Sequence, residues 1–239
     1  WDDVSASIRG TYKIDAKRMI FGGVSQAFRA PNLNDLTGNV TSRSGLAATG
    51  SLDVEPEEFV TTELGYRQDG ETSGFSAAVF YTEISDVITG VPITPDSTTT
   101  ASTNGSDGYV YGIELQGYWN IDSQCTLSGF AAWQDGRTQT PAFLGGPEQD
   151  EYLSRVLPLS GSIALRWQHP TQPFWIEGRI LASAEADRLT NSDRGDTQRI
   201  PTGGTPAYAV ASIRAGYDPT ERIQFTAAVE NLLDDDYRL

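Results

Sequence analysis

Long apolar runs are absent from this sequence. Its longest stretches without a polar residue, such as residues 130–133, are far shorter than the roughly 18 residues that a membrane-spanning helix requires. Hydrophobic residues make up 38% of the chain and the mean hydropathy is -0.36. A helical membrane protein is therefore excluded.

Cysteine and histidine are each represented by a single residue, Cys125 and His169. One cysteine cannot form an internal disulfide, and Cys125 falls in a strand-like segment where any small apolar residue would serve. Hydrolysis by a nucleophilic triad needs a nucleophile, a histidine and a carboxylate or amide placed together. His169 adjoins a short turn with no such grouping, so the sequence predicts no enzyme activity.

Basic residues are scarce, with 17 lysines and arginines against 32 acidic residues and a net charge of -15. This charge opposes binding to phosphate backbones, so nucleic acid is not expected as a partner. The excess of acidic residues has two possible interpretations: solvated acidic loops, or loops that collect cations or cationic ligands. Acidic groupings such as Asp187, Asp193 and Asp196 lack the spacing of a calcium loop and are expected to be solvated. The sequence predicts no cofactor and no metal site.

Period-two alternation is the main positive signal. In residues 4–14, apolar Ile8 and Tyr12 alternate with polar Arg9 and Lys13, which places two chemistries on opposite faces of one strand. Similar alternation predicts about ten strands, each near the roughly 9 to 11 residues that a tilted strand needs to cross a membrane. The predicted strands are residues 4–14, 18–28, 58–67, 72–84, 109–121, 124–134, 159–169, 174–185, 207–217 and 222–232.

Short and long connections between these strands alternate without exception. The short turns are expected at residues 15–17, 69–71, 122–123, 170–172 and 218–220. The long connections, rich in Gly, Ser, Thr, Asn, Asp and Pro, are residues 29–57, 85–108, 135–158 and 186–206. A soluble sandwich has no reason to keep its long loops at one end, whereas outer-membrane barrels have short periplasmic turns and long extracellular loops.

Aromatic residues gather at both ends of the predicted strands, as amphipathic rings do at the two headgroup levels of a membrane barrel. Near the short turns these are Tyr12, Tyr66, Trp119, Trp167, Phe174 and Tyr217, and at the opposite ends Phe28, Tyr109, Tyr111 and Trp133. The fold class predicted is all-β, an antiparallel transmembrane β-barrel of which this chain supplies part. Lipid-facing positions are expected to include Ile8, Ile113, Leu115, Ile163, Ile213 and Val229, and lumen-facing positions Arg9, Glu114, Arg166 and Arg214.

Several segments resemble TonB-dependent outer-membrane receptors. Residues 24–36 (VSQAFRAPNLNDL) resemble the Phe-Arg-Ala-Pro segment of that family, and residues 55–57 (EPE) with 62–66 (TELGY) resemble the strand that follows it. Further similar segments are residues 80–88, 111–115 and 229–234, with Tyr237 and Arg238. Each piece alone is weak, but their order and spacing across nearly the whole chain are specific.

The resemblance implies a barrel of about 22 strands filled by an N-terminal plug, and a periplasmic energy-coupling partner, TonB, that binds a short box before the plug. Residues 1–239 are then expected to be the C-terminal part of the barrel, with the plug, the first barrel half and the final strand absent. No cleavable leader opens the chain, so for an exported protein the N-terminus is expected to be missing. The expected location is the outer membrane of a Gram-negative bacterium, in contact with its lipid.

Ligand contacts are expected in the long loops, because loops carried on a rigid scaffold commonly carry binding. The candidates are Arg29, Asn32, Asn34, Arg43, Arg137, Arg188 and Arg194, which suit a polar or anionic metal chelate. For Arg29 a structural role, where the strand leaves the membrane before Pro31, is the competing interpretation. Haem-importing family members carry a histidine in the loop after this motif, and residues 32–54 contain none, so haem ligation is not expected.

The functional hypothesis is energy-dependent uptake of a scarce nutrient such as a ferric siderophore. A passive porin and, more distantly, a soluble structural β domain are the alternatives. A plug and a coupling box in the full gene would distinguish the receptor from the porin.

Overall fold

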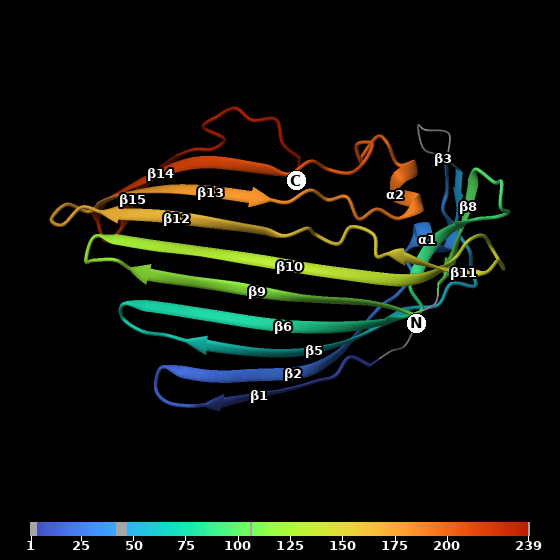
Figure 1. Ribbon diagram of the computed structural model, residues 1–239, viewed down its shortest axis with the longest axis horizontal. Coiled ribbons are helices and arrows are strands. Elements are labelled where there is room, and N and C mark those ends of the chain that lie inside the picture. The colour runs from blue at the N-terminus through green and yellow to red at the C-terminus, as the bar shows by residue number, and fades with distance from the viewer. Residues whose placement is uncertain (1–3, 42–46, 106, 239) are drawn as a thin grey trace.

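The computed structural model describes residues 4–41, 47–105 and 107–238. Its main feature is a sheet in which ten long strands follow one another as antiparallel neighbours, in the order β1-β2-β5-β6-β9-β10-β12-β13-β14-β15 (Figure 1). The strands are β1 (Ser7–Lys13), β2 (Arg18–Arg29), β5 (Glu57–Gln68), β6 (Ser73–Ser85), β9 (Gly108–Asn120), β10 (Cys125–Pro141), β12 (Ser160–Gln168), β13 (Phe174–Ser183), β14 (Tyr208–Thr220) and β15 (Ile223–Val229). The prediction of about ten strands is confirmed.

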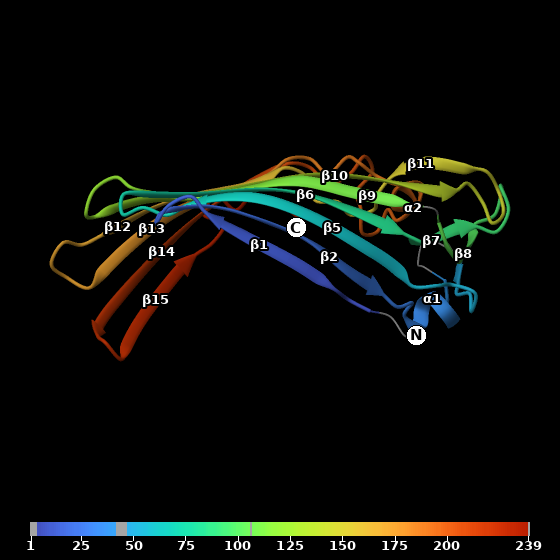
Figure 2. The same cartoon turned by 90° about the horizontal axis from the view of Figure 1, so that it is seen from below.

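The sheet is open and curved, seen from its edge in Figure 2. The described chain does not close into a two-sheet sandwich, and its apolar side chains, such as Ile8 at 76% exposure and Ile163 at 51%, stay uncovered. Exposed apolar rows of this extent are unusual on a soluble domain and fit a surface that meets lipid. Among the described residues, no helix is long and apolar enough to cross a membrane.

The strand register separates the two chemistries. Directly opposed residues of neighbouring strands point to the same face. Pairs such as Ile163 with Ile180 and Ile213 with Val229 extend one apolar face across the sheet. On the other face, Arg166 lies opposite Glu177, which lies opposite Arg214. Following the register from β1 to β15 confirms that the predicted lipid-facing residues share one face and the predicted lumen-facing residues the other.

The aromatic residues lie as expected. On the apolar face near the long loops, Tyr81 stacks with Tyr109 at 6.0 Å between ring centroids, and Trp133 meets Tyr111 edge-on at 5.6 Å. Near the short turns, Trp167 meets Phe174 at 6.5 Å.

On the polar face, rings also lie directly opposite glycines. A Cβ atom added at Gly65 would lie 2.2 Å from the Phe21 ring, and one at Gly216 would lie 2.3 Å from Trp175. These glycines let the rings lie flat against the sheet.

The long loops are more ordered than predicted. They contain the helices α1 (Leu33–Thr37) and α2 (Asn191–Gly195) and the strands β3 (Asn39–Thr41), β4 (Ala47–Thr49), β7 (Ile88–Pro92), β8 (Thr99–Asn104) and β11 (Glu148–Tyr152). A second sheet has the order β3-β4-β8-β7, and β4 pairs with β8 in parallel. The predicted antiparallel pairing holds for the ten strands of the main sheet, and the parallel pair lies in the loop sheet outside them. Strand β8 lies within residues 85–108, which were predicted as a long connection.

Two predicted boundaries also differ. Strand β10 continues to Pro141 and pairs with β11, so much of the expected loop 135–158 is a hairpin. The turn expected at residues 218–220 lies instead at residues 221–222, because β14 continues to Thr220 with a bulge between Tyr217 and Thr220. Pro219 falls inside that bulge, a position where a strand tolerates a residue without an N–H.

Candidate functional site at the loop end

The four long loops meet at one end of the main sheet. Figure 1 places α1, α2, β3, β8 and β11 together there, while the short turns lie at the other end. A small core lies under these loops, in which Val54 and Val91 are each 1% exposed and Ile84 is 5% exposed. The loops therefore form a packed cap over the strand ends and not a set of separate spacers.

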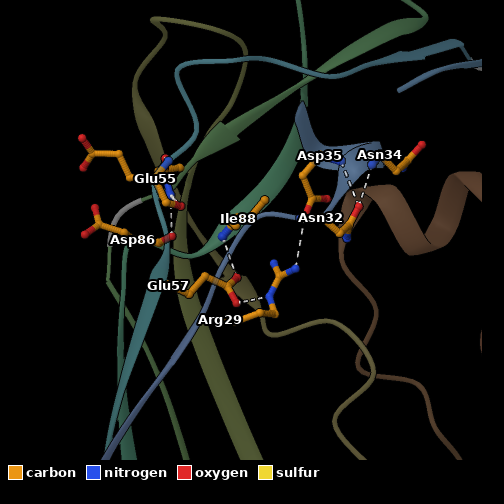
Figure 3. A network of polar contacts seen from close by, with 9 residues as sticks. Arg29, Asn32, Asn34, Asp35, Glu55, Glu57, Asp86 and Ile88 are labelled. Carbon is orange, nitrogen blue, oxygen red and sulfur yellow. Dashed lines mark hydrogen bonds and ion pairs between the residues drawn. The ribbon is translucent and has the colours of Figure 1, made fainter. Parts of the chain in front are cut away.

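A buried carboxylate ties three elements of this cap together (Figure 3). Glu57, at the start of β5, accepts a hydrogen bond from Arg29 Nε at 2.5 Å and another from the backbone N–H of Ile88 at 2.7 Å. Arg29 Nη1 also lies 3.2 Å from Asp35 Oδ2 in α1. The Glu57 side chain is 8% exposed and that of Arg29 41%. A carboxylate this buried requires such partners, so the contacts favour the structural role for Arg29.

Asn32 and Asn34 belong to the same corner. The Asn32 side chain accepts hydrogen bonds from the backbone N–H groups of Asn34 and Asp35, and the Asp35 carboxylate accepts one from the Asn32 N–H. This reciprocal arrangement is a capping box, which explains why so short a helix forms directly after Pro31. Asn32 is thus occupied with its own helix.

A second clamp joins the first two loops. The Asn104 side chain accepts from the Glu55 N–H at 2.8 Å and donates to the Glu55 carbonyl at 3.0 Å and the Asp86 carbonyl at 2.7 Å. Asp86 has a φ of 56°, a left-handed conformation that a short polar side chain tolerates. Three backbone groups from distant parts of the chain are therefore held by one amide.

A cleft of about 600 Å³ opens beside these contacts, between β7, the β10–β11 hairpin and α2. This volume falls within the roughly 300–1,000 Å³ of small-molecule sites. Its strand residues Phe59, Thr138 and Thr140 belong to the polar face of the sheet. The remaining lining combines hydroxyl and amide groups with apolar residues such as Val91 and Leu153.

Glu151 lines the same cleft from β11. It accepts a hydrogen bond from the Asn191 side chain of α2. Burial raises the pKa of Glu151 above its usual value, while the hydrogen bond with Asn191 and the charge of Arg194 act in the opposite direction. The cleft thus contains a carboxylate whose ionised form is only partly compensated.

A second cleft, of about 710 Å³, lies between the third and fourth long loops and the chain after β15. It is lined by apolar residues such as Leu157 and Leu181 together with Arg188. Arg188 Nη1 lies 2.9 Å from Asp135 Oδ1. This arginine therefore links the fourth loop to β10.

The other residues that were predicted to contact a ligand do not lie together. Arg137 lies on β10 and not in a loop, with its guanidinium 3.8 Å from the centre of the Tyr152 ring and 3.2 Å from Asp150. Arg194 lies on α2 and donates to Asn191 Oδ1 at 3.1 Å. Arg43 lies outside the described residues.

One acidic residue expected to be solvated is buried. Asp193 is 7% exposed, caps α2 through Thr190, and accepts from the Ser154 hydroxyl at 2.9 Å. The expectation was wrong because the capping box draws this carboxylate into the loop core. In the described part of the chain, no grouping of histidine, cysteine and acidic residues is placed to hold a metal ion.

Sequence reasoning missed the residues that organise the site, Glu57, Asn104 and Glu151. Glu57 stands in the Glu-Pro-Glu segment, whose likeness to the receptor family was a usable signal. Asn104 and Glu151 carry no local pattern, because their partners are distant in the sequence.

The sequence model of the family described as TonB dependent receptor-like, β-barrel, matches residues 1–232. The chain belongs to this family. An iron-regulated outer membrane virulence protein of Vibrio cholerae serotype O1 is 24% identical over 254 residues, which cover 96% of this chain and 35% of that protein.

Solved structures of TonB-dependent receptors share this fold. The copper transporter OprC superposes with a TM-score of 0.76 at 18% identity, over 98% of this chain and 34% of that one. The siderophore receptor PirA from Pseudomonas aeruginosa superposes with a TM-score of 0.68 at 16% identity, over 97% and 39%. The chain thus spans about a third of the length of the relatives it matches.

Membership in the TonB-dependent receptors confirms the predicted barrel fold and the location in the outer membrane of a Gram-negative bacterium. The family is one of non-enzymatic transporters, which agrees with the prediction of no enzyme activity. The apolar face of the ten-strand sheet is accordingly its lipid face, and the loop cap lies at the end of the strands away from the short periplasmic turns.

Proposed function

We propose that the whole protein is an outer-membrane receptor that imports a scarce nutrient, a ferric siderophore or similar metal chelate, with energy supplied through TonB. The observation that carries the proposal is the packed loop cap with a cleft of about 600 Å³ at one end of a receptor-family barrel. The relatives named as an iron-regulated outer membrane protein, a copper transporter and a siderophore receptor support a metal-bearing ligand.

The proposal includes the remainder of the barrel. Strands β1 and β15 each have one unpaired edge in the described sheet. Lipid does not tolerate unpaired backbone groups, so strands from outside this chain are expected to pair with both edges. We propose that residues 1–239 form the C-terminal part of the barrel, and that a plug, the first barrel half and a final strand complete it.

The residues predicted to contact a ligand fall into two groups. The contacts of Arg29 and Asn32 favour structural roles, since both are engaged with neighbouring backbone or carboxylate groups. Ligand contact remains a prediction for Asn34, Arg43, Arg137, Arg188 and Arg194. Replacing Arg188 with alanine is expected to weaken uptake while the barrel still assembles, because loop positions tolerate change better than strands.

Recovery of the full gene and growth of a deletion strain test the proposal. The gene is expected to encode a plug domain and a coupling box before this segment. A strain lacking the gene is expected to lose growth on at least one metal chelate supplied as the sole source of its metal. A gene with neither element, in a strain that grows normally on all chelates, would identify a passive porin instead.

A further inference from the structure

The cleft beside Glu57 has an acidic and neutral lining. Among its described lining residues, the ionisable side chains are those of Glu57 and Glu151, and no lysine, arginine or histidine faces it. Hydrogen-bonding groups come from residues such as Thr138, Thr140, Gln149, Ser154, Asn191 and Ser192. Such a lining offers donors and acceptors to a ligand but no fixed positive charge.

Three arginines around the cap are paired with carboxylates. Arg29 is paired with Glu57 and Asp35, Arg137 with Asp150, and Arg188 with Asp135. Each of these carboxylates offsets the positive charge of its arginine, which weakens the attraction of the arginine for a polyanionic ligand.

Glu151 differs from Glu57 in how its negative charge is balanced by neighbouring groups. Glu57 has a guanidinium at 2.5 Å, whereas the side chain that contacts Glu151 is the neutral Asn191 amide. The nearest cation is Arg194 of α2, which acts on Glu151 through its charge, and Asp193 of the same helix opposes it. Glu151 is thus the place in the cleft where a cation would be stabilised most.

We infer that this cleft selects metal chelates of neutral or positive charge with a hydrogen-bonding exterior, and that Glu151 sets this preference against polyanionic chelates. The inference rests on the proposed function and names the ligand class for it.

Binding to the purified full-length receptor tests the charge preference. The probes are a cationic ferric trihydroxamate and a polyanionic ferric tricatecholate, each titrated against the receptor by calorimetry. The wild-type receptor is expected to bind the cationic complex more tightly. Glu151→Gln is expected to weaken that complex on the order of tenfold and leave or improve binding of the anionic one, since one close charge is removed.

The matched control is Glu148→Gln. Glu148 lies on the same strand, β11, but its side chain belongs to the opposite face and outside the cleft lining. Glu148→Gln removes the same charge from the same hairpin. It is expected to leave the affinities for both chelates within about twofold of wild type, because surface charges of this kind contribute little.

Acidification provides a second readout. Asp193 and Arg194 of α2 act on Glu151 through their charges, and Glu57 of β5 lines the same cleft. Because the pKa of Glu151 is raised, affinity for the cationic chelate is expected to be full above that pKa and to fall as the pH passes down through it. This fall is expected to be absent in Glu151→Gln.

Two outcomes overturn the inference. One is tighter binding of the tricatecholate by the wild-type receptor, and the other is an equal effect of Glu148→Gln and Glu151→Gln. In either case uptake of a metal chelate would leave the proposed function standing. If neither chelate binds and the deletion strain grows normally on every metal chelate, the proposed function fails and the inference fails with it.

Discussion

Replacing Arg29 with alanine is expected to loosen the loop cap without unfolding the barrel. The change leaves Glu57, 8% exposed, with the Ile88 N–H at 2.7 Å as its hydrogen-bond partner. Removing one partner of a fully buried ion pair costs about 3–5 kcal/mol, and an exposed pair contributes about 0–1 kcal/mol. Since the Arg29 side chain is 41% exposed, a cost of about 2 kcal/mol between these limits is expected.

Hydrogen exchange of the Ile88 amide measures this cost locally. A loss of about 2 kcal/mol corresponds to roughly 30-fold faster exchange through local opening. The control is Arg18→Ala at the other end of β2, where the ion pair with Asp15 is exposed. The reasoning is refuted if Ile88 exchanges at the wild-type rate in Arg29→Ala, or if both variants accelerate it equally.

Two further predictions concern barrel assembly, read as the folded fraction on unboiled gels. Gly65→Ala is expected to destabilise by about 1–3 kcal/mol, because its Cβ would lie 2.2 Å from the Phe21 ring, whereas Gly10→Ala meets no atom within 4 Å and is expected to assemble normally. Ile163→Lys places a charge on the lipid face at a cost of about 2–4 kcal/mol, and Ser162→Lys on the lumenal face is the control. Equal folding within either pair of variants would contradict the packing or the face assignment, respectively.

The strands could be predicted because their signal is local. Alternation such as Ile8-Arg9 depends on neighbouring residues alone, and it identifies both the strand and its two faces. The open lipid surface was predictable for the same reason. Boundaries were less accurate where polar strand residues, such as Thr138 and Thr140 of β10, resemble a loop.

The loop cap could be predicted only in part. The capping box of α1 is a local pattern, Asn32 followed by Asp35, and was available in the sequence. Distant segments are joined by the parallel pairing of β4 with β8, by the contacts of Asn104 with Glu55 and Asp86, and by the meeting of Glu57 and Glu151 in one cleft. No spacing rule connects such residues, since their contacts follow from where the barrel brings the loops.

Uptake of radiolabelled iron as a ferric chelate, in cells that carry the full gene, tests the central claim most directly. Uptake is expected to saturate with chelate concentration and to be lost when TonB is deleted or the proton-motive force is collapsed. Uptake that rises in proportion to the external concentration and continues unchanged without TonB would contradict the account and identify a passive channel.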